Sequence, residues 1–255
     1  PNIIVTIPGS GGGGSVIINS HSDVGPGPEE AFSPRYEDGV VYGRGACDAK
    51  GQVAAIILAL NAIRELGIRL KGDLRAQIVI EEEAGGNGSL SLLQQGHRAD
   101  AAIILEPTNL KIHPANRGAV WFKIGVKGKS AHMGKYWEGV SAINEMLGIV
   151  DILRQYEVFL REESTGNPMF PQEPSLVNVN IGQINGGDWP ATVPAECFIE
   201  GGIAFLPNRR IEQIREELQA AIESKASAWV KDHYTFEFGR LHNEAFETAV
   251  DHPAV

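Results

Sequence analysis

The 255-residue sequence is poor in cysteine and in basic residues, and both shortages exclude classes of protein. Two cysteines, Cys47 and Cys197, are too few for a disulfide framework, so nothing indicates a secreted, disulfide-stabilised scaffold. Lysine and arginine number 22 against 32 acidic residues, which gives a net charge of -10. An acidic surface repels nucleic acid and anionic membranes, so we expect neither as a partner.

We expect neither a targeting signal nor a membrane span in this sequence. No charged segment followed by an apolar one marks a signal, and we find no apolar run that approaches the length of a span. The apolar fraction of 43% is that of a soluble globular protein. We therefore predict a cytoplasmic location.

Strand-like and helix-like segments alternate over residues 1–117, which predicts an α/β layer domain. The glycine-rich stretch 8–14 indicates a turn, because it lacks the Lys-Ser/Thr pair of a phosphate-binding loop. The strands expected at 74–80 and 100–106 are almost continuously apolar, as in a sheet covered on both faces. The expected strands are 3–7, 15–19, 74–80 and 100–106, and the expected helices are 51–67 and 89–96.

The pattern changes near residue 117, where a second and smaller domain is expected over residues 118–239. Its order of elements is βαββαβ, which is the ferredoxin-like signature. Residues 240–255 are expected to return to the first domain without completing it, so we interpret the sequence as part of a longer chain. The expected strands are 119–128, 175–184, 191–205 and 234–239, and the expected helices are 139–160 and 208–230.

Acidic residues and one histidine collect at strand ends in the first domain, where ligands gather in open α/β sheets. Two residues apart on an extended chain, His21 and Asp23 point to the same side, so Asp23 can accept a hydrogen bond from the imidazole. One histidine with several carboxylates suits zinc, cobalt or manganese. Strand ends often carry polar residues simply because they reach solvent, which explains any one of these sites. It explains less readily why all of them occur together. The residues are His21, Asp23, Asp48, Glu81, Glu82, Glu83 and Glu106.

Most of the other reactive residues are expected to be structural, and His132 is the exception. Cys47 has no evident basic partner and is taken as a small filler residue. His132 lies in a glycine-rich segment between a strand and a helix, a position suited to reaching a substrate, although an exposed loop histidine is the alternative. The remaining histidines are interpreted as structural: His97, His113, His233, His242 and His252.

Five segments in this order, "HSDV", "GRGACDAKG", "EEEAGGNG", "LEPT" and "GKSAHMG", closely resemble the M20 metallopeptidases. That family includes acetylornithine deacetylase, succinyl-diaminopimelate desuccinylase, aminoacylase and glutamate carboxypeptidase. The resemblance covers nearly the whole chain. It implies an α/β zinc-peptidase-like catalytic domain with an inserted ferredoxin-like domain, through which we expect a homodimer.

The resemblance also implies two divalent metal ions, zinc with cobalt or manganese as alternatives, and a role for each site residue. A metal-activated water would cleave the amide bond of an N-acyl amino acid. Rival interpretations are a dipeptidase or carboxypeptidase acting on small peptides, a non-catalytic binding homologue, and a glycosidase, which leaves the His21–Asp23 pair unexplained. His21 and Glu106 would bind one metal and Glu83 the other, with Asp48 bridging, Glu82 as general base, Asp23 orienting His21, and His132 stabilising the oxyanion.

The sequence departs from the family pattern in two places. The family needs a further metal-binding histidine beyond residue 255, and His252 falls too early to supply it. Deacylase members carry an asparagine and an arginine that hold the substrate carboxylate, and the matching positions here are Ala191 and Ala204. An alanine does not replace a guanidinium, so Arg209 or Arg117 would have to compensate.

Overall fold

The computed structural model describes residues 1–170, 176–253 and 255, and the chain divides into two compact units. The first unit is Pro1–His113 and the second is Pro114–Pro253. The expected boundary lay four residues later, after residue 117. The segment 240–253, expected to return to the first domain, groups with the second unit.

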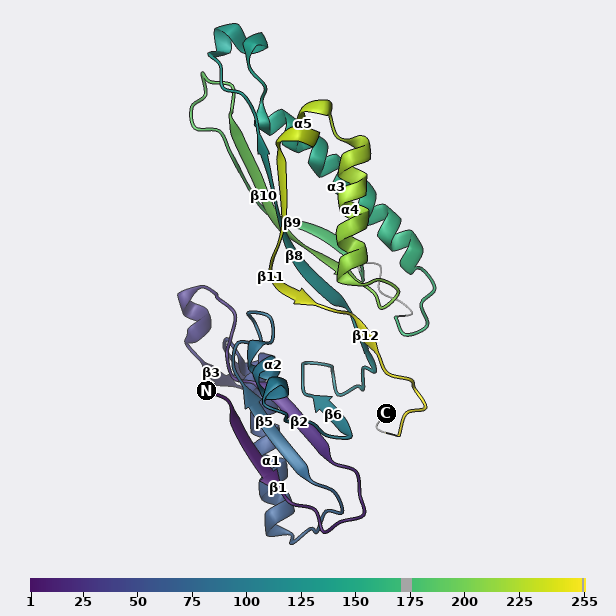
Figure 1. Cartoon of the computed structure of the whole chain (residues 1–255). Coiled ribbons are helices and arrows are strands. Elements are labelled where there is room, and N and C mark those ends of the chain that lie inside the picture. Colours follow the sequence, from purple (N-terminus) through teal and green to yellow (C-terminus); the bar gives the residue numbers. More distant parts are fainter. Residues whose placement is uncertain (171–175, 254) are drawn as a thin grey trace. The chain divides into compact units, whose positions relative to one another are not determined.

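The first unit is built on a four-stranded mixed sheet in the order β1-β5-β2-β6 (Figure 1). Strand β2 pairs in parallel with both β5 and β6, and β1 is antiparallel to β5. Because β2, β5 and β6 are parallel, their carboxyl ends meet at one edge, where open α/β sheets place ligands. The strands are β1 (Ile3–Ile7), β2 (Val16–His21), β5 (Leu74–Val79) and β6 (Ala101–Ile104).

Two helices accompany this sheet, α1 (Gly51–Glu65) and α2 (Asn87–Gln94). Helix α1 packs against β2 and buries Ile56. The helical segment Ala46–Glu65, with mean hydropathy 1.3, is long and apolar enough to pass as a membrane span, which corrects the expectation of no such run. The regular helix α1 has 15 residues and so covers only about 22 Å, which suits a helix lying on a sheet better than one crossing a bilayer.

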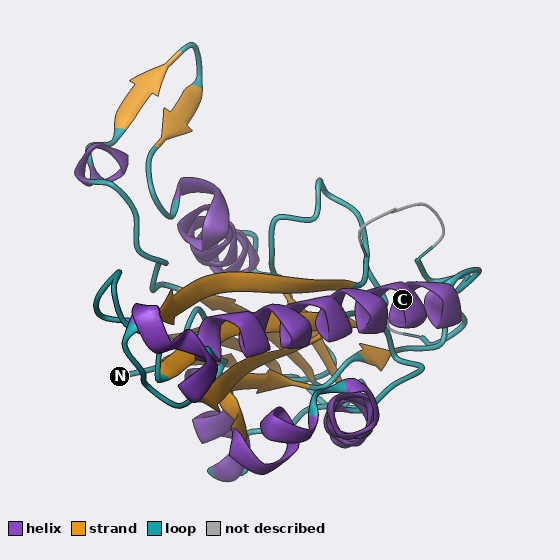
Figure 2. Cartoon of the chain, turned by 90° about the horizontal axis from the view of Figure 1, so that it is seen from above, coloured by secondary structure: helices purple, strands orange, loops and turns teal. Residues whose placement is uncertain are grey.

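A small hairpin of β3 (Arg35–Glu37) and β4 (Val40–Tyr42) follows the short helix η1 (Glu29–Phe32) and projects from the first unit (Figure 2). All six residues of its strands are exposed. The irregular turn η2 (Ala46–Lys50) then leads into α1.

The second unit has a four-stranded antiparallel sheet in the order β11-β8-β10-β9. Its helices α3 and α4 lie along one face of the sheet (Figures 1 and 2), giving the expected βαββαβ order and a ferredoxin-like fold. The elements are β8 (Gly118–Lys127), α3 (Ala142–Ser164), β9 (Asn178–Gly186), β10 (Glu196–Phe205), α4 (Ile211–Lys225) and β11 (Tyr234–Asn243).

The core of the second unit lies between the sheet and these helices. Phe122 of β8 and Ile203 of β10 are buried there with Leu153 of α3 and Leu218 of α4. Shorter elements complete the unit: β7 (Ala115–Asn116) pairs with β12 (Phe246–Glu247), and η3 (Met133–Glu138) precedes α3.

Several elements of the second unit differ from their expected bounds, and β10 begins at Glu196 rather than at residue 191. The helix expected over 208–230 is divided into α4 and α5 (Ala228–His233), because the Ser227 hydroxyl accepts a hydrogen bond from the Val230 N–H and starts a new helix. Strand β11 continues past residue 239 to Asn243 through an irregular register after Phe238. Ser175, expected to open the second strand of this unit, lies outside the described residues.

Candidate metal centre

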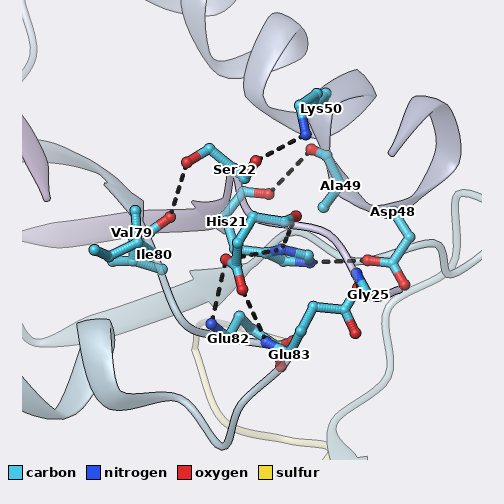
Figure 3. A network of polar contacts seen from close by, with 12 residues as sticks. His21, Ser22, Gly25, Asp48, Ala49, Lys50, Val79, Ile80, Glu82 and Glu83 are labelled. Carbon is cyan, nitrogen blue, oxygen red and sulfur yellow. Dashed lines mark hydrogen bonds and ion pairs between the residues drawn. The ribbon is translucent and has the colours of Figure 1, made fainter. Parts of the chain in front are cut away.

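His21 is the centre of an acidic cluster at the carboxyl end of β2 (Figure 3). Its ring is 1% exposed, and its Nε2 lies 2.8 Å from Asp48 Oδ1 and 3.8 Å from Glu106 Oε1. Ligand atoms of these three residues all lie within 4.8 Å of one another. Within the described part of the chain they form the group able to hold a metal ion, and they are three of the four expected ligands.

The turn η2 brings Asp48 to His21. Gly45, just before it, has φ 84°, and a Cβ there would lie 2.7 Å from the Val24 side chain, so the position requires glycine. The Lys50 ammonium at the end of the turn donates a hydrogen bond of 2.8 Å to the Ser22 carbonyl. This bond ties the turn directly to the end of β2.

The three consecutive glutamates sit on a tight turn between β5 and α2. Glu81 has φ 59°, an uncommon left-handed conformation for a residue with a side chain. Gly85 and Gly86 have φ 113° and 77°, and a Cβ on Gly88 would lie 2.2 Å from the Ile80 carbonyl oxygen. The glycines after the acidic run are therefore needed to turn the chain sharply back into α2.

Asp23 contacts His21, as expected, and also the turn that carries the glutamates. Its carboxylate accepts hydrogen bonds from the backbone N–H groups of Glu82, at 3.3 Å, and Glu83, at 3.2 Å. His21 Nδ1 lies 3.1 Å from the Asp23 main-chain oxygen and 3.5 Å from its carboxylate. The main chain of Asp23 thus meets the imidazole most closely, while its side chain fixes the turn that carries the glutamates.

Glu83 lies outside the three-residue group. One of its carboxylate oxygens accepts a 2.7 Å hydrogen bond from the Gly25 N–H. Neither Gly25 nor Lys50 was expected to take part in the site. The pairing of Gly25 with Glu83 has no signal in the sequence beyond the glycine-proline stretch that follows the "HSDV" segment.

Burial and neighbouring charges shift the pKa values of this cluster. Burial, with the charges of Glu82, Asp48 and Glu83, raises the pKa of Glu106 to about 7 against the opposing effect of His21. Burial also raises the pKa of Glu82. For His21, burial favours the neutral ring, but the hydrogen bond to Asp48 and the neighbouring carboxylates outweigh it and raise its pKa.

The donor set fits a divalent metal ion. One imidazole nitrogen and two carboxylates converge on a small volume, which matches the ligands that zinc and related ions take. Burial and the neighbouring carboxylates both disfavour the charged form of Glu106, and a cation would offset both effects. His21, Asp48 and Glu106 would hold it.

The remaining predicted residues belong to the second unit. His132 precedes η3, its Nδ1 accepts a hydrogen bond of 3.1 Å from the Gly134 N–H, and residues 131–133 pair with 191–193, so Ala191 lies beside it. Ala204 lies in β10. The two arginines expected to compensate both have partners: Arg209 is paired with Glu163 and Glu217, and Arg117 donates to the Leu176 carbonyl.

Comparison with known proteins identifies the class of protein. The model of peptidase family M20/M25/M40 matches residues 17–255, and the chain belongs to this family. The fold supports the assignment: the chain superimposes with a TM-score of 0.65 on a dinuclear metal-binding peptidase of the M20 family from Bacillus subtilis, with 16% identity, covering 98% of this chain and 63% of that one.

Two curated relatives are similar in sequence over most of this chain. An N-formyl-4-amino-5-aminomethyl-2-methylpyrimidine deformylase from Halalkalibacterium halodurans is 30% identical over 91% of this chain and 58% of its own length. An acetylornithine deacetylase from Pasteurella multocida is 32% identical over 89% of this chain and 59% of its own length. The chain therefore spans somewhat more than half of each relative.

Proposed function

We propose that this chain carries the metal-binding part of an amide hydrolase that cleaves a small N-acyl compound with water. The N-acyl amino acids expected from the sequence belong to this class, and short peptides are the alternative substrate. The observation that carries the proposal is the convergence of His21, Asp48 and Glu106 with half-buried Glu82 in their field. The two similar relatives, a deformylase and a deacetylase, both remove an acyl group by name.

Each residue of the cluster has a proposed task. His21, Asp48 and Glu106, with Glu83 as a fourth ligand, hold two divalent ions, with zinc as first choice and cobalt or manganese as alternatives. When bound, such ions lower the pKa of a water molecule and polarise a carbonyl. Glu82 takes the proton from the attacking water and delivers it to the leaving amine, a role that suits a carboxylate with a raised pKa. Asp23 keeps Glu82 and Glu83 in place.

The two units divide the work in this proposal. Residues 1–117 form the catalytic part, residues 118–239 a lid and dimerisation domain, and residues 240–255 the path back toward the catalytic part. His132 of the lid stabilises the oxyanion. We propose a cytoplasmic homodimer, and its support is that β9 is an edge strand, able to pair with a second chain. Light scattering at twice the mass of one chain would support the dimer.

The test is restoration of activity by metal in the protein at its natural length. Chelator-treated protein would receive zinc, cobalt or manganese and a panel of N-acyl amino acids, dipeptides and the N-formyl aminopyrimidine. We expect metal-dependent turnover that Glu82→Gln lowers by about 100- to 10,000-fold. Glu81→Gln is the matched control, because it removes the same charge one residue away. Metal binding without turnover on the whole panel would favour a binding homologue, and failure to bind metal would refute the site.

A further inference from the structure

The open face of the second unit's sheet contains a cavity that the metal centre does not use. Helices α3 and α4 cover the other face, where Val120 and Phe122 of β8 are buried. Successive residues of a strand point to opposite faces, so Ala119, Trp121 and Lys123 point to the open side. The cavity there has a volume of about 760 Å³, within the range of small-molecule sites. We call it the sheet groove.

Small residues leave the floor of the sheet groove flat. Each of the four strands contributes at least one of them, so backbone takes the place of side chains over much of this face. A floor of this kind accepts a planar group more readily than a bulky one. The small floor residues are Ala119, Gly182, Gly202, Ala204 and Gly239.

Trp121 supplies an aromatic surface beside this floor. It stands between two glycines of neighbouring strands: a Cβ on Gly202 would lie 3.3 Å from Trp121 Cδ1, and one on Gly239 would lie 3.0 Å from Trp121 Cβ. The indole covers glycine backbone, which also stabilises a sheet. However, 48% of Trp121 is still exposed, enough for a planar ring to stack against it.

The charges in the sheet groove favour a ligand that is not anionic. Lys123 lies opposite Glu200 of β10 on one side and Glu237 of β11 on the other, and its ammonium is 2.7 Å from Glu200 Oε1. Among the described lining residues, two carboxylates therefore surround one cation. A carboxylate ligand meets a net negative charge here, whereas an amino group can donate to Glu200 or Glu237.

We propose that the sheet groove binds a planar heteroaromatic amine, neutral or cationic, stacked on Trp121 with its amino groups toward Glu200 and Glu237. The site lies wholly within the second unit and stands independently of the proposed function. Ala204 agrees with it, because this small residue leaves the floor open and adds no charge to the groove.

Calorimetric titration of metal-free protein tests this directly, because it needs no turnover. The probes are 4-amino-5-aminomethyl-2-methylpyrimidine, benzoate as a planar anion, and cyclohexylamine as a non-planar cation. We expect the pyrimidine to bind, Trp121→Leu to weaken it about tenfold, and Trp121→Phe to recover most of the loss. Glu237→Gln should also weaken the pyrimidine, and benzoate should bind more weakly than the pyrimidine.

Three results would overturn the inference: equal pyrimidine affinity in the wild type and Trp121→Leu, benzoate binding as tightly as the pyrimidine, or cyclohexylamine doing so. Glu237→Gln and Trp121→Phe keep the test decisive if circular dichroism shows that Trp121→Leu does not fold. Glu82→Gln should keep pyrimidine binding, because Glu82 does not line the sheet groove. Absence of hydrolysis with Trp121-dependent binding of the pyrimidine would refute the proposed function alone. Metal-dependent hydrolysis without Trp121-dependent binding would refute the groove alone.

Discussion

Replacing Asp23 by asparagine separates two tasks that one side chain could perform beside His21. The Asp23 carboxylate accepts the N–H groups of Glu82 and Glu83 at 3.3 and 3.2 Å, and lies farther, at 3.5 Å, from the imidazole. Asparagine has nearly the same shape but a single acceptor oxygen, so one of the two N–H groups would face an NH2 group. We therefore expect the Glu82–Glu83 turn to loosen while the fold is retained.

The size of the effect follows from the bond that is lost. A hydrogen bond to a charged group contributes about 1.5 to 3 kcal/mol, and the long distances and the 25% exposure of the Asp23 side chain favour the lower value. A loss of about 1.5 kcal/mol changes a local opening equilibrium roughly tenfold. The Glu82 and Glu83 amides should therefore exchange with solvent about ten times faster, and turnover should fall because Glu82 is held less well.

Hydrogen exchange followed by NMR measures this effect amide by amide, with zinc titration measured on the same samples. Asp38→Asn is the matched control, because Asp38 is exposed at the tip of the hairpin and its φ of 49° suits asparagine. Unchanged exchange at Glu82 and Glu83, together with weaker zinc binding, would refute this reasoning. It would instead show that the Asp23 carboxylate acts on His21, as the sequence had suggested.

Three further predictions test other parts of the molecule. Ala204→Arg should add a cation to the sheet groove and strengthen the binding of benzoate relative to that of the pyrimidine; an unchanged ratio of the two affinities would contradict this. Folding raises the pKa of Glu106 above its ordinary value of 4.5 and that of His21 above 6.5. Proton binding by each group therefore stabilises the fold below its ordinary pKa, and this stabilisation is lost as the pH rises through the raised pKa. The Tm of metal-free protein should thus fall from about pH 5 to about pH 8 while the increase caused by zinc grows, and a flat profile would argue against these shifts. Ser227→Ala should lower the free energy of unfolding in urea by about 1 kcal/mol through loss of the α5 cap, with Ser10→Ala as an exposed control.

The approach of His21 and Glu106 could be predicted because it follows from topology, whereas Asp48 is brought to them by the turn η2. Parallel strands end at the same edge, so polar residues that follow them in the sequence come together in space. The ferredoxin-like order of the second unit could also be predicted, because the apolar periodicities of its strands and helices are long and clear. The break at Ser227 was missed because the apolar pattern continues through it, and a single hydroxyl that caps a helix changes no periodicity.

The contacts of Asp23 and Gly25 could not be predicted, because they depend on backbone directions inside a turn. Which N–H groups point at a carboxylate is decided by dihedral angles such as φ 59° at Glu81, and no spacing rule carries that information. Likewise, nothing in the sequence shows that Lys123 lies between Glu200 and Glu237, since that requires the register of three strands.

The acidic run at 81–83 shows why adjacent like charges can be tolerated at a strand end. Had β5 continued as a strand, Glu81 and Glu83 would share a face, and nothing would hold the three carboxylates apart. The left-handed residue Glu81 ends the strand instead, and each following glutamate takes a partner of its own. Glu82 is half-buried in the field of His21, while Glu83 binds the Gly25 N–H. Burial, with the remaining repulsion from its neighbours, raises the pKa of Glu82, which suits the proton transfer proposed for it.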